Sequence, residues 1–120
     1  MKNAINHFEL PVLDLGRAAA CYETLLGVPM RRETFGGLPY ALFPHEEPGV
    51  SGALVEDPKR TPGGGTIVYL NADGQLDAIL ARAERAKATI VVPKTPIGPE
   101  GFIAILVDTE GNRVGFNSVA

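Results

Sequence analysis

The stretch HFELPVLDLGRAAACYETLLG, residues 7–27, begins with a short extended segment and then continues into a helix. Asp14 stands where its carboxylate can accept hydrogen bonds from the first backbone amides of that helix, so we expect it to be the N-cap. Apolar residues then recur at spacings of three and four and form one face: Leu15, Ala18, Ala19, Tyr22, Leu25 and Leu26. Gly27 followed by Pro29 is typical of a helix end. The stretch therefore predicts a strand followed by an amphipathic helix.

The second half of the chain repeats this pattern. The stretch TIVYLNADGQLDAILARAERAKA, residues 66–88, can be laid over the first with a constant offset of 59 residues, so that His7 matches Thr66 and Asp14 matches Asp73. Its helix carries a similar apolar stripe, made by Leu76, Ile79, Leu80 and Ala83. The repeat predicts that the chain contains two copies of one module.

Extended segments follow each predicted helix. They are rich in Val, Ile and Phe, are bounded by Gly and Pro, and cover residues 40–44, 50–56, 89–94, 101–108 and 112–119. The sequence DTEGN, residues 108–112, predicts a tight turn between the last two strands. The segment KRTPGGG, residues 59–65, predicts the joint between the modules. We expect an α+β fold in which residues 1–120 form one domain, with module 1 at about 1–58 and module 2 at about 64–120.

Composition excludes several classes of partner. The chain is 45% hydrophobic and 21% charged with a net charge of −3, which gives no electrostatic footprint for nucleic acid or an anionic membrane. No apolar stretch approaches the roughly 20 residues of a membrane span. Cys21 is the sole cysteine, so an intrachain disulfide and a Cys-rich metal cluster are excluded. With no signal-peptide pattern at Met1–Ile5, we expect a cytoplasmic protein.

Two motifs are specific in combination: DLxRA at 14–18 with Tyr22 and Gly27, and DxEGN at 108–112. Over nearly the whole chain these residues resemble the vicinal oxygen chelate superfamily, which includes glyoxalases, bleomycin-resistance proteins and extradiol dioxygenases. The resemblance implies two tandem βαβββ modules that form a concave mixed sheet around a cleft, commonly in a homodimer. It does not by itself imply one reaction, because a fold can host unrelated functions.

The resemblance also implies a divalent metal ion, held in the cleft by His and Glu from the first and last strands of each module. His7 stands where the family has its first-strand histidine, but the matching position of the second half is Thr66. Gly115 occupies the place of the last-strand glutamate, and residues 50–55 hold no His, Asp or Glu. A lone imidazole does not retain a catalytic ion. We therefore expect no metal cofactor; a site that includes His7 is the less favoured alternative.

A cleft without metal still has polar residues. His7, Glu9 and Pro11 share one face of the first strand, because residues two apart in a strand point the same way. A carboxylate beside an imidazole can act as an acid or a base, so His7 and Glu9 are the catalytic candidates. The alternative is that this pair only orders the sheet.

On the last strand, Arg113, Gly115 and Asn117 share a face, and the repeat predicts Thr66, Val68 and Leu70 as the neighbours of that face. The ligand-binding candidates are Thr66, Tyr40, Tyr69, Phe102, Arg113 and Asn117. The three aromatic residues could stack on a ligand, or could belong to the core or a dimer contact.

Three functions remain open at this level. The first, which we favour, is a protein that binds a small molecule in the cleft without transforming it. The second is an enzyme, either a lyase or isomerase that uses His7 and Glu9 or a dioxygenase-like metalloenzyme. The third is a regulatory or accessory domain. A bound metal would favour the second function, and an empty, tightly packed cleft would favour the third.

Overall fold

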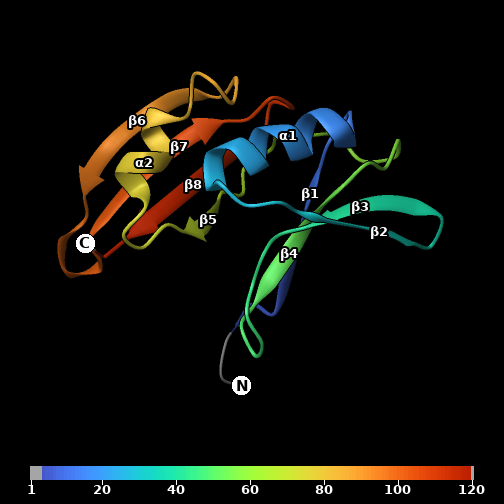
Figure 1. The fold of residues 1–120 in the computed structure, drawn as a ribbon, viewed down its shortest axis with the longest axis horizontal. Coiled ribbons are helices and arrows are strands. Elements are labelled where there is room, and N and C mark those ends of the chain that lie inside the picture. Colours follow the sequence, from blue (N-terminus) through green and yellow to red (C-terminus); the bar gives the residue numbers. More distant parts are fainter. Residues whose placement is uncertain (1–3, 120) are drawn as a thin grey trace.

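The structure is a computed structural model that describes residues 4–119. The first module contains β1 (His7–Pro11), α1 (Leu15–Leu26), β2 (Arg31–Phe35), β3 (Leu38–Leu42) and β4 (Ser51–Val55). The second contains β5 (Val68–Asn71), α2 (Leu76–Ala81), β6 (Thr89–Pro96), a short 3-10 helix η1 (Gly98–Glu100), β7 (Phe102–Val107) and β8 (Arg113–Ser118). This order confirms the predicted α+β fold with two tandem βαβββ modules (Figure 1).

Each module forms its own four-stranded mixed sheet. The strand orders are β1-β4-β3-β2 and β5-β8-β7-β6, so the first strand of each module lies at a sheet edge. β1 pairs with β4, and β5 with β8, in parallel, whereas the remaining pairs are antiparallel. In Figure 1, α1 lies along the junction of the two sheets and contacts β3, β4 and α2.

Helix α1 begins and ends as the sequence predicts. The Asp14 side chain accepts a hydrogen bond of 2.9 Å from the Arg17 amide, which confirms Asp14 as the N-cap. Gly27 adopts the left-handed conformation with φ 74°, and its N–H donates to the Glu23 carbonyl. This geometry favours glycine because other residues pay a steric cost at positive φ.

Strand β2 was not predicted, because its sequence RRETF is rich in charge and lacks an apolar alternation. It is an edge strand, and most of its residues are exposed to solvent. The sequence feature that could have indicated β2 is the turn that follows it. Gly36 and Gly37 both have positive φ, of 58° and 78°, and form the two-residue loop that joins β2 to β3. Such a Gly-Gly pair is typical of a tight β-hairpin.

The strand register of the repeat corrects one expectation. Val68 and Leu70 do not share a face with Gly115; both pack against the core, and Tyr69 lies beside Gly115 in the β5–β8 ladder. Phe8 and Leu10 of β1 also face the core, so the inward-facing positions of β1 and β5 differ by an even number of residues, such as 60, and not by 59. The difference matters because a slip of one residue moves every side chain to the opposite face of its strand.

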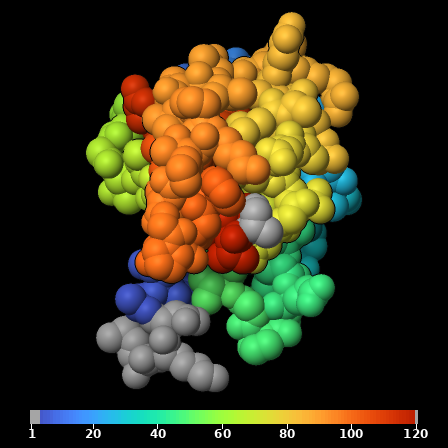
Figure 2. Space-filling view, turned by 90° about the vertical axis from the view of Figure 1, so that its left-hand side faces the viewer, coloured from blue at the N-terminus to red at the C-terminus, as the bar shows by residue number. Residues whose placement is uncertain are grey.

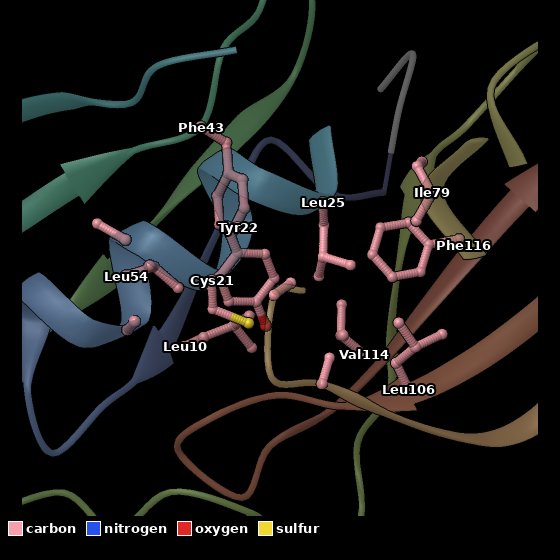
Figure 3. Packing of buried hydrophobic residues seen from close by; sticks show 14 of the residues in the cluster. Leu10, Cys21, Tyr22, Leu25, Phe43, Leu54, Ile79, Leu106, Val114 and Phe116 are labelled. Carbon is pink, nitrogen blue, oxygen red and sulfur yellow. The ribbon is translucent and has the colours of Figure 1, made fainter. Parts of the chain in front are cut away.

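Most buried apolar residues of the described chain belong to one cluster that includes both modules (Figure 3); Ala53 and Val55 of β4 are buried outside it. Tyr22 and Leu25 come from α1, and they lie between Phe43 of the first module and Phe116 of the second. The Tyr22 and Phe43 rings meet edge to face at a centroid distance of 5.2 Å. Cys21 is also buried here, and burial raises the pKa of its thiol. The two modules thus share a core.

The outer strand of the second sheet lies at the surface. Figure 2 shows the β6 region and α2 side by side on one face of the molecule, and Ile90 and Val91 of β6 remain 41% and 39% exposed. Within residues 4–119, no helix has the length and apolar character that a membrane crossing requires.

Candidate functional site

The outward face of β1 carries a cluster of charged side chains. His7 Nε2 lies 3.5 Å from Glu9 Oε2, which confirms that the two residues share a face. Arg60, from the joint between the modules, donates a hydrogen bond of 2.6 Å to the other oxygen of Glu9. Arg60 Nε also lies 3.3 Å from an Asp57 carboxylate oxygen. Sequence reasoning missed Arg60, because 51 residues separate it from Glu9 and no local pattern links the two.

The arginine changes what Glu9 can do. Partial burial alone would raise the pKa of Glu9, but the hydrogen bonds and charges of Arg60 and His7 outweigh burial and lower that pKa below its ordinary value. Glu9 is therefore an anion at neutral pH, with a reduced affinity for protons. It is better suited to holding its neighbours in place than to removing a proton from a substrate.

A hollow of about 910 Å³ lies between the neighbouring edges of β1 and β5. His7, Thr66 and Tyr69 line it, so the structure brings together three of the predicted site residues. The remaining lining is mainly apolar and consists of Ala4, Ile5, Phe8, Val50, Ile67, Val68 and Leu70, with Asn71 as a further polar group. Below, this space is called the β1–β5 hollow.

A second hollow, of about 560 Å³, lies on the other side of Tyr69. Asn117 lines it, and its side-chain amide donates to the backbone carbonyls of Glu100 and Phe102 at 3.2 and 3.0 Å. Asn117 is thus held by main-chain contacts, and Tyr69 forms part of the wall of both hollows.

The ring of Tyr69 covers Gly115. A Cβ atom built at position 115 would overlap the ring atoms of Tyr69, which occupy the space above the glycine. Gly115 is the position at which the family resemblance implies a metal-binding glutamate. In this chain an aromatic ring from the neighbouring strand fills that place.

The other three predicted residues lie apart from the β1–β5 hollow. Tyr40, on β3, meets Phe35 edge to face at 5.3 Å. The pKa of Arg60 is raised chiefly by its hydrogen bond to Glu9. Phe102 packs against the core, beneath the Lys94 ammonium at 4.7 Å.

Arg113 is exposed on β8 and lines neither hollow. Of the eight candidates, the structure therefore gathers His7, Glu9, Thr66, Tyr69 and, across the Tyr69 ring, Asn117.

The motifs that carry the family resemblance join the two modules. Glu110, in the β7–β8 turn, accepts hydrogen bonds from the backbone amides of Leu13 and Asp14 at 2.8 and 2.9 Å. Arg17 donates to both Glu110 oxygens at 2.7 and 2.9 Å. Burial would raise the pKa of Glu110, but the hydrogen bonds from Arg17, Thr109 and the backbone lower it to about 2. This carboxylate fixes the start of α1 against the second module.

Two further side chains of the same turn strengthen the joint. Asp108 accepts a 2.6 Å hydrogen bond from the buried Tyr22 hydroxyl and also binds the amides of Glu110 and Asn112. The Asn112 side-chain amide donates to the Pro11 carbonyl, while its oxygen accepts from the Gly63 amide. The structure therefore gives these motif residues a role in module assembly.

The side chains do not fit a metal site of the family type. Among the described residues, no three His, Cys, Asp or Glu side chains lie close enough together to hold an ion. His7 and Glu9 are neighbours, but Arg60 already occupies one Glu9 oxygen and Gly115 supplies no ligand. A divalent ion with open positions for a substrate needs about three protein ligands.

Comparison with solved structures supports the fold. The chain is 27% identical to UcmS2 over 98% of both chains, with a TM-score of 0.67. It is 16% identical to the fosfomycin resistance protein FosX from Mesorhizobium loti, covering 100% of this chain and 94% of that one, with a TM-score of 0.67. A lactoylglutathione lyase from Agrobacterium tumefaciens is 18% identical, covering 97% and 93%, with a TM-score of 0.65.

No curated protein matches the sequence. The model of one family, described as the Glyoxalase/Bleomycin resistance protein/Dioxygenase superfamily, matches residues 4–116. That match includes both modules, both motifs and the turn that joins them. The chain belongs to the glyoxalase/bleomycin resistance protein/dioxygenase superfamily.

Proposed function

We propose that this protein binds a small molecule in the β1–β5 hollow and does so without the family metal ion. The observation that carries the proposal is the hollow itself, of about 910 Å³, with His7, Thr66 and Tyr69 on its walls. Small-molecule sites are commonly about 300–1,000 Å³ and combine apolar walls with a few polar groups. The hollow has this size and this chemistry.

The metal-free part of the proposal rests on the side chains. One Glu9 oxygen is bound to Arg60, and the Tyr69 ring stands over Gly115, where the resemblance implies a ligand. The solved structures similar to this chain include a fosfomycin resistance protein and a lactoylglutathione lyase, so proteins of this fold are named for more than one function. Membership alone does not select between these functions.

The alternative is a lyase or isomerase that uses His7 and Glu9. The 3.5 Å contact between the two side chains is the observation in its favour. Arg60 weakens this alternative, because it lowers the pKa of Glu9 and makes the carboxylate a poorer base. A dioxygenase-like reaction is less favoured still, since the side chains offer no ligand set for its metal.

We further propose that the protein forms a homodimer, as the family resemblance implies. The exposed apolar side chains of β6, Ile90 and Val91, are consistent with a surface that a second copy covers. Sedimentation equilibrium should give twice the mass of one chain. A monomer at all accessible concentrations would contradict this proposal.

We also propose a cytoplasmic location. The lone, buried Cys21 is consistent with a reducing compartment. Cell fractionation with an antibody against the protein should place it in the soluble cytoplasmic fraction, and recovery from the medium or the envelope would contradict this.

Binding can be tested with Nile red, an uncharged dye whose fluorescence rises in apolar surroundings. We expect saturable binding of about one dye per chain that EDTA does not change. Thr66→Trp should weaken it about tenfold, because the indole would fill the β1–β5 hollow. Thr61→Trp is the matched control, because Thr61 is exposed like Thr66 and lies five residues before it, but lines neither hollow.

Two results would contradict the proposal. One is the absence of saturable binding in the wild-type protein. The other is retention of about one Zn²⁺, Ni²⁺, Mn²⁺ or Fe²⁺ per chain after desalting, lost on His7→Ala, which would indicate a metal site.

A further inference from the structure

A smaller apolar pocket opens beside the β1–β5 hollow. Its volume is about 270 Å³, and it lies where the end of α1 and the start of α2 face β1 and β5. The rings of Phe8 and Phe43 form part of its wall, together with Leu26 and Ile79. In Figure 3, Phe43 and Ile79 lie on either side of Leu25. An apolar cavity of about 150 Å³ is enough to accept benzene, so this side pocket can hold a single ring or a short branched alkyl group.

The side pocket and the β1–β5 hollow adjoin each other. Phe8, Val50, Leu70 and Asn71 line both spaces. One ligand can therefore extend from one space into the other, past the Phe8 ring and the Asn71 amide. Val28 lines the side pocket but not the β1–β5 hollow, and it is 41% exposed to solvent.

The side pocket and the β1–β5 hollow differ from the other hollows in that acidic and basic side chains are missing from the described part of their walls. Of the described residues that line them, none is Asp, Glu, Lys or Arg, and the titratable groups are the His7 imidazole and the Tyr69 phenol. The second hollow, across Tyr69, differs because Asp73 and Glu100 line it. A charged group that enters an apolar site without a partner pays a large desolvation cost. Arg60 cannot serve as that partner without giving up Glu9.

Polar atoms are nevertheless present, and they suit a neutral head group. Thr66 offers a hydroxyl and Asn71 an amide, both in the β1–β5 hollow, and Asn71 stands where the hollow meets the side pocket. Hydroxyls, carbonyls and amides of a ligand can bond to such groups without a counter-ion.

We propose that the ligand is an uncharged amphipathic molecule whose hydrogen-bonding head lies in the β1–β5 hollow and whose ring or branched alkyl tail lies in the side pocket. This inference rests on the proposed binding function and names its ligand class. It excludes phosphorylated, polyanionic and polycationic ligands from this site, because the lining has no Asp, Glu, Lys or Arg side chain to pair with them.

Three probes with the same tail test the head group: phenylbutanol, phenylbutyrate and phenylbutylamine. They are neutral, anionic and cationic at neutral pH, and binding to the full chain is followed by shifts of the backbone amide signals in NMR. We expect phenylbutanol to bind about tenfold more tightly than either charged probe. Equal affinities for the three, or a preference for a charged one, would overturn the inference.

Two matched variants test the tail. Val28→Trp places an indole at the rim of the side pocket and should weaken phenylbutanol about tenfold. Val119→Trp, at an exposed valine outside both spaces and away from the β6 surface proposed for the dimer, should leave the affinity unchanged. If Val28→Trp binds phenylbutanol as well as the wild-type protein does, the tail does not use the side pocket.

Failure of this inference differs from failure of the proposed function. If Nile red binds but none of the three probes does, the ligand class is wrong while the binding function stands. If neither Nile red nor the probes bind, both proposals are wrong.

Discussion

Because Gly115 has no side chain, the ring of its neighbour Tyr69 can lie directly over it. The two residues are paired in the β5–β8 ladder, and the ring of Tyr69 lies in the space that a side chain at position 115 would need. The position therefore carries an aromatic wall instead of the carboxylate that the resemblance implies. Tyr69 also lines both hollows beside β5, as Leu70 and Asn71 do.

Gly115→Ala should displace that ring. We expect a loss of about 1 kcal/mol in the free energy of unfolding, because the new methyl group overlaps Tyr69. In a Tyr69→Ala background the same change should be neutral or stabilising, since the overlap is gone and alanine restricts the unfolded chain more than glycine does. Urea denaturation of the four proteins gives the coupling free energy directly. Equal effects of Gly115→Ala in both backgrounds would show that the ring does not rest on the glycine.

At the scale of elements, the β7–β8 turn and the start of α1 act as one unit. Glu110 from the turn binds the amides of Leu13 and Asp14, and Glu56 binds the next amide, that of Leu15, at 2.7 Å. The first amides of a helix have no partners within the helix, so these carboxylates and the Asp14 cap satisfy groups that would otherwise be unpaired.

The lowered pKa of Glu110 makes this unit sensitive to acid. Burial opposes ionisation, but the hydrogen bonds prevail and the folded-state pKa is about 2, against 4.5 when unperturbed. A lowered folded-state pKa stabilises the protein fully above the unfolded pKa, and the stabilisation disappears as the pH falls from about 4.5 to about 2. We expect the wild-type protein to lose about 3 kcal/mol from this carboxyl over that range.

Glu110→Gln should remove this part of the pH dependence and destabilise the protein by about 3 kcal/mol at pH 7. Urea denaturation at pH 7, 4.5 and 3 measures both effects. Glu84→Gln, at an exposed position, is the control and should retain the wild-type profile. If the unfolding free energy of Glu110→Gln falls with pH as steeply as that of the wild-type protein, a group other than Glu110 causes the acid sensitivity.

Elements also differ in how well the sequence predicts them. Both helices, the turn at 108–112 and five of the strands after the helices follow from local patterns. Strand β2 does not, because an exposed edge strand needs no apolar alternation. Helix α2 ends at Ala81, although the apolar pattern continues and Ala83 and Ala86 are buried. The later residues pack on the core as turns, so burial continues where the helix does not.

At the scale of the whole molecule, the two modules depend on each other. The core cluster of the described chain includes residues of both modules, and Tyr22 of the first module bonds to Asp108 of the second. A module alone would expose half of this core and leave Asp108 or Tyr22 without its partner. The single domain expected from the sequence therefore stays a prediction, which the following experiment tests.

Separated modules should therefore fail to fold. We expect the fragments 1–58 and 64–120, each prepared alone, to lack dispersed amide signals in NMR, because neither can complete the core. Mixing the two should restore the dispersion of the full chain, since the contacts across the joint are noncovalent. A stable, cooperative unfolding transition in either isolated fragment would show that the modules are two domains.

The sequence by itself determined the strand–helix order, the Asp14 cap, the Gly27 helix end and the family, because each depends on residues near one another or on a repeated pattern. Only the tertiary structure decided which residues meet. Arg60 reaches Glu9 across 51 positions and Glu110 reaches Arg17 across 93, and no local pattern encodes such pairs. The register of β5 was decided there too, because packing against the shared core selects which face is buried, and an error of one residue inverts both faces.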